Sequence, residues 1–259
     1  MTMWSDSETQ MDSGFLRLDL RMAKEVQKAF IPQNSPIPGL ECETFYRPAH
    51  GVSGDYYDFF QVSSGKWGIA IGDVSGKGIG AALVMAKLQA SVRAQAQRSH
   101  SDPAIAMKRV NQLLYESAPI HFYASLFYAE YDPVTRTLTY VNAGQNPPIV
   151  IRCEDGRSKV FRLESDGIPV GLFENSNYRS ADFQLQAGDI LVACTDGIME
   201  MEDQEGKQWG QQRLEDLFLI CDRRTPGHVV SSILREVSAF ARGRAPQDDM
   251  TLIVLQVDL

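Results

Sequence analysis

Aspartates that stand beside glycines, at the edges of short apolar runs, are the feature that most limits how this chain of 259 residues can fold. They occur at residues 53–58, 71–78 and 194–197, and a fourth segment, residues 247–251, carries two aspartates without a glycine. Glycine tolerates unusual backbone angles and lets an ion, water or another backbone come close. Carboxylates gathered from four places repel one another unless a positive charge lies between them. The pattern therefore predicts either four unrelated turns or one site that holds divalent cations.

Composition excludes several classes of protein. The chain is 44% hydrophobic and 22% charged, which is ordinary for a globular protein, and it is long enough to bury a substantial core. A net charge of -8 argues against a general nucleic-acid binder. The first twelve residues lack the apolar core of a signal peptide, and runs such as residues 252–255 are too short to span a bilayer. We therefore expect a cytoplasmic protein with no membrane and no nucleic acid among its partners.

The cysteines and histidines show no arrangement that would carry chemistry. The four cysteines form no CxxC pair, which argues against a zinc site. None of them is followed six positions later by arginine, the spacing of a cysteine-phosphatase loop. The four histidines form no HxH or HExxH pattern. These absences leave the aspartates, whose oxygen ligands suit Mg²⁺ or Mn²⁺.

Apolar periodicity predicts an α+β domain. Helices are expected over residues 13–31, 78–98, 103–117, 214–220 and 228–242, and strands over residues 40–47, 57–62, 67–71, 122–131, 137–142, 148–152, 159–163, 183–185, 189–194 and 250–257. Short strands joined by turns, with helices in blocks, are typical of largely antiparallel sheets. A hairpin of the second and third strands would place Asp55 and Asp73 near one end of a shared sheet. Residues 164–180 are expected to form an irregular surface excursion.

The helix expected over residues 13–31 carries two apolar stripes. One stripe comprises Phe15, Leu18, Met22, Val26 and Ala29, and the other comprises Leu16, Leu20, Ala23 and Phe30. So broad an apolar face is typical of a helix that packs on its own domain and against something else, although an ordinary docked helix is equally consistent. We divide the chain into residues 1–35, a helix and connector that are candidates for regulation or homodimerisation, and residues 36–259, one catalytic-sized domain.

The ordered set of motifs resembles the PPM family of phosphatases (protein phosphatase type 2C-like), in its bacterial SpoIIE/RsbU branch. The resemblance covers residues 18–257 and rests on residues 25–32, 53–58 (Ser-Gly-Asp-Tyr-Tyr-Asp), 72–78 (Gly-Asp-Val-Ser-Gly-Lys-Gly), 143–148 (Ala-Gly-Gln-Asn-Pro-Pro), 195–200 (Thr-Asp-Gly-Ile-Met-Glu) and 248–251 (Asp-Asp-Met-Thr). It implies a sandwich of two central antiparallel β-sheets flanked by α-helices, with a two-metal site at one end. It also implies that residues 164–180 form a variable flap that touches the substrate.

The same resemblance implies the residues of the site. Carried over one by one, the catalytic carboxylates around two Mn²⁺ or Mg²⁺ ions are those of Asp55, Asp73, Asp196 and Asp248. Val74 would offer its backbone carbonyl to a metal. Asp249, at a position that is often asparagine in other branches, would either ligate a metal or support a ligand. The implied reaction is hydrolysis of phosphoserine or phosphothreonine by a metal-activated water, without a phosphoenzyme.

The chain departs from the family pattern at three positions. Ser53 replaces the first glycine of Gly-Gly-Asp, and Gln145 replaces a histidine of the Ala-Gly-His-Asn-Pro-Pro segment; neither change removes a metal carboxylate. Ser75 stands where eukaryotic members have histidine, so the proton donor to the leaving group stays open between a metal-bound water and Lys77. Arg47 is either a phosphate contact or a structural residue, and the phosphate-binding residues stay unassigned.

By resemblance, the substrate is a phosphorylated STAS-domain anti-sigma factor antagonist in a bacterial partner-switching pathway. An upstream sensor protein would supply the signal. Two other hypotheses remain: a catalytically weak binding module of the same fold, and a two-metal phosphoesterase that acts on small phosphoesters. The presence of all four site aspartates favours an enzyme over the binding module.

Overall fold

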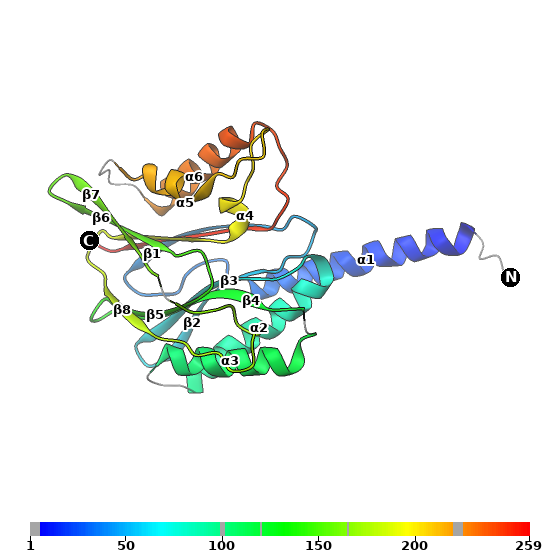
Figure 1. The fold of residues 1–259 in the computed structure, drawn as a ribbon, viewed down its shortest axis with the longest axis horizontal. Coiled ribbons are helices and arrows are strands. Elements are labelled where there is room, and N and C mark those ends of the chain that lie inside the picture. Colours follow the sequence, from blue (N-terminus) through cyan, green and yellow to red (C-terminus); the bar gives the residue numbers. More distant parts are fainter. Residues whose placement is uncertain (1–5, 99–101, 120, 165, 220–224) are drawn as a thin grey trace.

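The computed structural model describes residues 6–98, 102–119, 121–164, 166–219 and 225–259. Two antiparallel five-stranded sheets face one another (Figure 1). The first sheet has the order β1 (Leu40–Arg47), β10 (Met250–Val257), β9 (Ile190–Cys194), β6 (Ile149–Glu154) and β7 (Arg157–Arg162). The second has the order β2 (Asp55–Ser63), β3 (Lys66–Val74), β4 (Ala124–Asp132), β5 (Thr137–Ala143) and β8 (Ala181–Gln184). This architecture confirms the predicted α+β sandwich.

Helices cover the outer face of each sheet (Figure 1). Those on the second sheet are α2 (Gly78–Arg98) and α3 (Pro103–Ser117), and those on the first are α4 (Asp196–Met199), α5 (Gly210–Asp216) and α6 (Pro226–Ala241). The side chain of Asp102 caps α3 and that of Thr225 caps α6. Each of these helices also has a proline in its first turn, where no backbone N–H is needed. Both helices therefore begin where the local sequence specifies a start.

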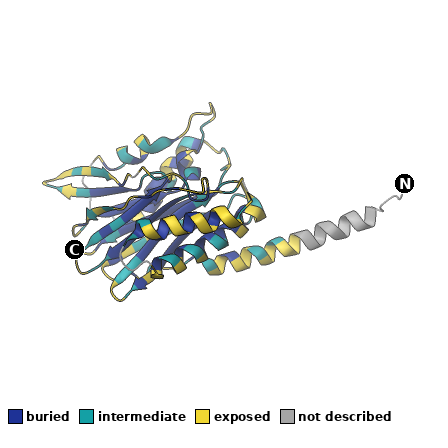
Figure 2. Ribbon diagram, turned by 60° about the horizontal axis from the view of Figure 1, so that its bottom comes forward, coloured by how far each residue is buried: buried dark blue, intermediate teal, exposed yellow. Residues whose placement is uncertain are grey.

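Apolar side chains form three layers, because successive residues of a strand point to opposite faces of its sheet. On β3, Ile69 and Ile71 lie between the two sheets, whereas Ala70 and Val74 belong to the layer shared with α2 and α3. A third layer, which includes Ile233 of α6, lies between the first sheet and its helices. Figure 2 shows the strands largely buried and the outer faces of the helices exposed. The layer between the sheets ends at the aspartates described below.

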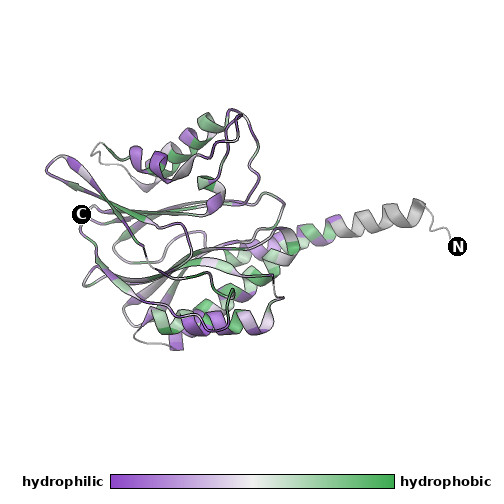
Figure 3. Cartoon of the chain, viewed as in Figure 1, coloured by the Kyte–Doolittle hydropathy of each residue, from purple (hydrophilic) through white to green (hydrophobic). Residues whose placement is uncertain are grey.

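The N-terminal helix α1 (Asp6–Phe30) extends away from the sandwich (Figure 1) and is longer than the predicted helix at its first end. Hydrophobic and hydrophilic residues alternate along its described part (Figure 3). Leu18, Met22 and Val26 are 53%, 61% and 56% exposed, whereas Gln27 on the opposite face is buried. No helix in the described ranges is long and apolar enough to cross a bilayer. The described residues of this predicted stripe, from Leu18 to Ala29, are therefore open to solvent, and the side chains of Phe15 and, in the other stripe, Leu16 lie outside the described part.

Most predicted elements are confirmed, and the differences lie at element ends. Helix α5 occupies residues 210–216 rather than 214–220, of which residue 220 lies outside the described ranges. The apolar run that follows α5 leaves the helix: Phe218 N–H bonds to the carbonyl of Glu215, three residues back, and the ring is buried. The short helix α4 was not predicted, since four residues are too few to show a period.

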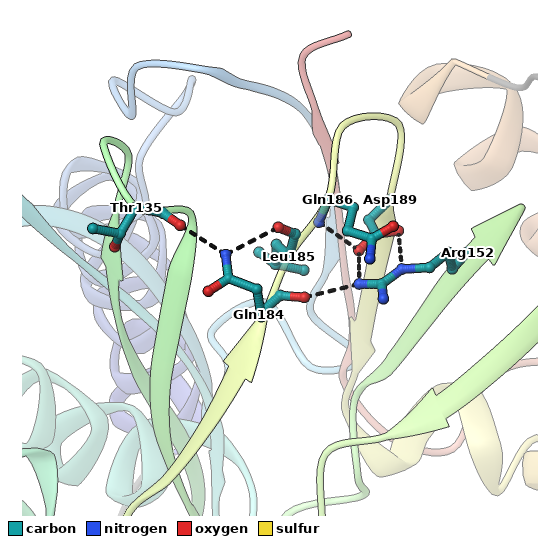
Figure 4. Close-up of polar contacts among 6 residues, drawn as sticks. All are labelled: Thr135, Arg152, Gln184, Leu185, Gln186 and Asp189. Atoms are coloured by element: carbon teal, nitrogen blue, oxygen red, sulfur yellow. Dashed lines mark hydrogen bonds and ion pairs between the residues drawn. The ribbon is translucent and has the colours of Figure 1, made fainter. Parts of the chain in front are cut away.

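At the end of the sandwich where β9 begins, Arg152 of β6 joins the two sheets (Figure 4). Its guanidinium binds both oxygens of Asp189, at 2.9 and 2.6 Å, and donates to the carbonyl of Gln184 on β8 at 2.8 Å. The rings of Phe161 and Phe183 lie against the guanidinium, at 5.3 and 5.6 Å from their centroids. The buried carboxylate of Asp189 is thus neutralised within the chain.

Candidate metal centre

Asp55 and Asp73 lie directly opposite each other on β2 and β3, at the other end of the sandwich. Tyr57 and Ile71, two residues along each strand, belong to the layer between the sheets, so both aspartates share that inner face. Asp55 is only 1% exposed. The predicted hairpin and its placement of these two carboxylates near one end of a sheet are confirmed.

Two threonines of the first sheet reach across the sandwich to Asp55. Thr195 and Thr251 donate their hydroxyls to Oδ2 of Asp55 at 2.7 and 2.5 Å. The other oxygen, Oδ1, is buried and has no hydrogen-bond partner. The sequence did not reveal the role of either threonine, although each belongs to a motif that contains a predicted site aspartate. The two sheets therefore meet at the carboxylate of Asp55, whose Oδ2 is hydrogen-bonded and whose Oδ1 is not.

Asp196 and Asp248 come from two segments whose backbones are in contact. Asp196 follows β9 as the first residue of α4, and Asp248 lies just before β10, the neighbouring strand. A Cβ atom at Gly197 would lie 1.8 Å from the carbonyl oxygen of Asp249, which no side chain permits. The glycine of Thr-Asp-Gly is thus required for the close approach of the two aspartate-bearing segments.

The carboxylates of this cluster perturb one another. Burial raises the pKa of Asp55, and the nearby Asp249 and Asp196 raise it further, against the hydrogen bonds of the two threonines. Burial raises the pKa of Asp73, and the charges of Asp55, Asp196 and Asp248 raise it further. Burial followed by the charge of Asp248 raises the pKa of Asp196 to about 6. Acidic side chains from four distant segments of the sequence therefore interact electrostatically at one end of the sandwich.

The donor set suits a hard divalent cation. The unpartnered Oδ1 of Asp55 is a free carboxylate oxygen beside Asp73. A Cβ at Gly54 would lie 2.9 Å from the carbonyl oxygen of Val74 and 3.2 Å from Oδ1 of Asp73, so glycine leaves room around both oxygens. In the described part of the chain, no three or more His, Cys, Asp or Glu side chains already converge as a ligand set. An ion would have to draw these carboxylates closer together.

Asp249 is engaged with the backbone of the loop that carries Asp55. Its Oδ1 accepts the N–H of Ala49 at 2.6 Å, and its Oδ2 accepts the N–H of Gly54 at 2.9 Å. The residue is 4% exposed. These bonds hold the start of β10 against the 49–54 loop, so Asp249 positions Asp55. Its direct coordination of a metal stays a prediction.

The structure also gives the positions of four other residues singled out in the sequence. Lys77 forms an ion pair with Oδ2 of Asp248, at 2.7 Å. Ser75 donates its hydroxyl to the carbonyl of His121 and accepts the N–H of Tyr123, so its side chain holds two loops together. Gln145 accepts the hydroxyl of Ser125, the residue opposite Asp73 on β4. Arg47 ends β1 on an exposed position opposite Met250.

The described part of the predicted flap is tied to α3 by one buried amide. Asn111 donates to the carbonyls of Phe173 and Glu174, at 3.0 and 3.1 Å, and accepts from the N–H of Gly171 and the hydroxyl of Tyr178. This anchor was not recognised from the sequence, because a single asparagine on a helix gives no local signal. The irregular conformation predicted for this excursion is confirmed.

A pocket of about 190 Å³ opens beside the cluster. Its lining includes Lys77, Asp248, Glu200, Gln208 and Arg244. Arg244 pairs with Glu202 rather than with a carboxylate of the cluster. A polar cavity therefore adjoins the aspartates, and its lining includes one basic side chain that pairs with Asp248 and a second that does not.

Two facing antiparallel sheets flanked by helices are the fold of PP2C-type domains. The SiaA-PP2C domain of Pseudomonas aeruginosa has this fold, with a TM-score of 0.82 over 98% of this chain and 100% of that one, at 18% identity. The chain belongs to the SpoIIE family, because the model of that family, "Stage II sporulation protein E (SpoIIE)", matches residues 63–258. The resemblance inferred from the motifs is thus confirmed.

Two curated relatives match over nearly the whole chain. Protein IcfG of Synechocystis sp. is 26% identical over 95% of this chain, which spans 42% of the relative. Phosphoserine phosphatase RsbU of Bacillus subtilis is 26% identical over 93% of this chain, which spans 70% of the relative. The chain thus covers less than half of one relative and about two thirds of the other.

Proposed function

We propose that this chain is a Mn²⁺- or Mg²⁺-dependent serine/threonine protein phosphatase. The observation that carries the proposal is the opposed, buried pair of Asp55 and Asp73. The charged groups that act most strongly on these two residues are other aspartates, and Oδ1 of Asp55 has no partner. Such an arrangement is unfavourable unless a cation binds there. Membership of a phosphatase family supports the same conclusion.

In this proposal the four carboxylates and one carbonyl hold two ions. Asp55 and Asp73 bind or bridge them, Val74 offers its carbonyl oxygen, and Asp196 and Asp248 complete the set. Bound ions of this kind lower the pKa of water and neutralise charge on a phosphoryl group, which allows hydrolysis without a phosphoenzyme. The protein contributes rigidity: the threonine hydroxyls fix Asp55, and Asp249 fixes its loop and either adds a ligand or supports one.

The proposed substrate is a phosphoserine or phosphothreonine on a STAS-domain anti-sigma factor antagonist, in a bacterial partner-switching pathway in the cytoplasm. The relative named phosphoserine phosphatase RsbU supports this chemistry. The substrate protein would lie over the pocket beside Asp248 and against the flap, whose Leu172 and Phe173 are exposed. A protein substrate is favoured over a small phosphoester because these apolar side chains offer contact area beyond the phosphoryl site.

Two measurements separate the proposed phosphatase from the two other hypotheses. Turnover of p-nitrophenyl phosphate is measured with and without Mn²⁺, for the wild type and for Asp196→Ala. A binding module would show no Mn²⁺-dependent rate above that of Asp196→Ala. Rates on matched phosphopeptides and mononucleotides then distinguish a protein phosphatase, which prefers the peptides, from a small-molecule phosphoesterase, which prefers the nucleotides.

We also propose that residues 1–35 regulate the phosphatase domain, through a homodimer or an upstream sensor protein. Gln27, near the end of α1, donates to the carbonyl of Ser53 at 2.8 Å and accepts the N–H of Ser53 at 2.9 Å. Ser53 in turn accepts the N–H of Asp55 on its hydroxyl. A rotation or shift of α1 would thus be transmitted directly to the loop that carries a site carboxylate. The exposed stripe of Leu18, Met22 and Val26 is the candidate partner surface.

Deleting residues 1–31 tests this regulation. We expect the deletion to change turnover and, if a homodimer forms, the mass measured by light scattering. Gln27→Ala isolates the hydrogen bonds from the partner surface, and should alter turnover with no change in mass. Unchanged turnover and mass in the deletion variant would contradict a regulatory role.

A further inference from the structure

We infer that Lys77 is a placeholder cation for the aspartate cluster, paired with Asp248 until a divalent ion takes that carboxylate. The inference rests on the metal site proposed above and adds a residue that controls how the site fills. Its basis is the ion pair at 2.7 Å between Nζ of Lys77 and Oδ2 of Asp248. The same ammonium donates to the carbonyl of Gln247, also at 2.7 Å.

The position of Lys77 divides the four aspartates into two pairs, called here the outer half and the inner half. The outer half, Asp196 and Asp248, has this ammonium close by: Lys77 is in contact with Asp248 and acts to lower the pKa of Asp196. In the inner half, Asp55 accepts only the neutral hydroxyls of Thr195 and Thr251, its Oδ1 has no partner, and Asp73 lies opposite it. An ion that binds the inner half meets two carboxylates without displacing anything. An ion that binds the outer half has to replace Lys77 on Asp248.

The ion pair is placed so that it can be exchanged. The side chains of Lys77 and Asp248 are 44% and 37% exposed, so solvent screens the pair and a divalent ion competes effectively for the carboxylate. Lys77 precedes α2 and stands four residues after Asp73, and its side chain lines the adjoining pocket. By contrast, Arg152 and Asp189 are 12% and 1% exposed, and their pair has no comparable access to solvent. An exposed lysine is a reversible counter-ion, whereas a buried arginine is a permanent one.

Mn²⁺ titration calorimetry on the full chain, stripped with a chelator and held at one pH and ionic strength, tests the inference. Lys77→Met should leave the tighter binding event unchanged and strengthen the weaker one about three- to tenfold, because it removes both a competitor and a repelling charge. Lys77→Arg, which keeps the charge, should bind as the wild type does. The matched control is Arg244→Met, which removes the same charge from another side chain of the pocket, one that pairs with Glu202 rather than with Asp248, and should have little effect.

Each outcome decides the matter. If the wild type binds Mn²⁺ and Lys77→Met binds it no more tightly, or more weakly, Lys77 is not a placeholder and the proposed metal site still stands. If neither protein binds Mn²⁺, the metal site fails and the placeholder fails with it. An equal gain in Arg244→Met would show a general effect of charge and would also overturn the inference. Circular dichroism establishes that each variant is folded, and Lys77→Gln replaces Lys77→Met if the latter is not.

Discussion

The two ends of the sandwich both contain buried aspartate, but they treat its charge differently. At the end where β9 begins, Asp189 accepts two hydrogen bonds from Arg152 and a third from the N–H of Gln186 (Figure 4). At the end where β9 finishes, Asp55 receives only neutral hydroxyls and faces Asp73. The fold thus supplies a cation where the aspartate has a structural role. Among the described residues no cation is in contact with Asp55 or Asp73, which is why we propose that they bind an ion.

The largest expected effect is on catalysis, at the end of the sandwich that contains Asp55 and Asp73. Asp73→Asn keeps the shape of the side chain but removes a negative charge from the cluster, so Mn²⁺-dependent hydrolysis should fall about 10³-fold, or about 4 kcal/mol. Initial rates on a phosphopeptide at saturating Mn²⁺ measure it. Asp182→Asn, on the exposed edge strand β8, is the control and should retain wild-type activity. More than a tenth of the activity remaining in Asp73→Asn would remove that carboxylate from the reaction.

The next largest effect is on folding at the neutralised end. Asp189→Asn leaves Arg152, whose side chain is 12% exposed, without its counter-charge, and should lower the free energy of unfolding by about 3 kcal/mol. Urea unfolding followed by circular dichroism measures the change. Asp182→Asn serves again as the control, since its carboxylate is exposed. A loss below about 0.5 kcal/mol, the range of ordinary surface changes, would mean that the arginine contributes little to holding the sheets together.

The sequence predicted the regular helices and strands that form the two ends of the sandwich. Strand alternation and helix starts were strong local signals, and β1, β10, α2 and α3 occur over the predicted residues. The cross-strand placement of Asp55 and Asp73 followed from one hairpin, because a short turn fixes the register of its strands. The four aspartates were found as an ordered set of motifs, which no single Asp-Gly pair could have indicated.

Contacts between distant segments could not be read in the same way. The bonds of Thr195 and Thr251 to Asp55 depend on how two sheets face each other, which no local pattern encodes. Gln27 and Asn111 likewise act on segments far along the chain. Asp58 belongs to a quoted motif, yet it is buried and paired with Arg93 of α2 at 2.6 Å, so it anchors that helix. Within residues 53–58 the sequence therefore did not distinguish Asp55, the proposed site carboxylate, from Asp58, whose role is structural.

A smaller effect of opposite sign is expected when the ions are removed. In the chelator-treated protein, Asp73→Asn should raise the free energy of unfolding by about 1–2 kcal/mol, because it relieves repulsion and burial of a charge beside Asp55. Asp189→Asn should lower it under the same conditions. Urea unfolding in EDTA compares the two variants with the wild type. Destabilisation by both substitutions would mean that Asp73, like Asp189, stabilises the metal-free fold, and that the two ends of the sandwich do not differ.

The smallest effect is a dependence of the metal-free protein on pH. The folded-state pKa values of Asp55, Asp73 and Asp196 are raised, that of Asp196 to about 6, so the folded chain binds more protons than the unfolded chain above about pH 4. Stability is therefore greatest below that range and falls as pH rises through the raised values. Between pH 5 and pH 8 in EDTA we expect Asp196 alone to account for a loss of about 1 kcal/mol, measured by urea unfolding. Saturating Mn²⁺ should abolish the loss, because a bound cation favours the ionised carboxylates. Asp73→Asn should reduce it without metal, whereas a slope that persists unchanged in that variant would place its origin outside the cluster.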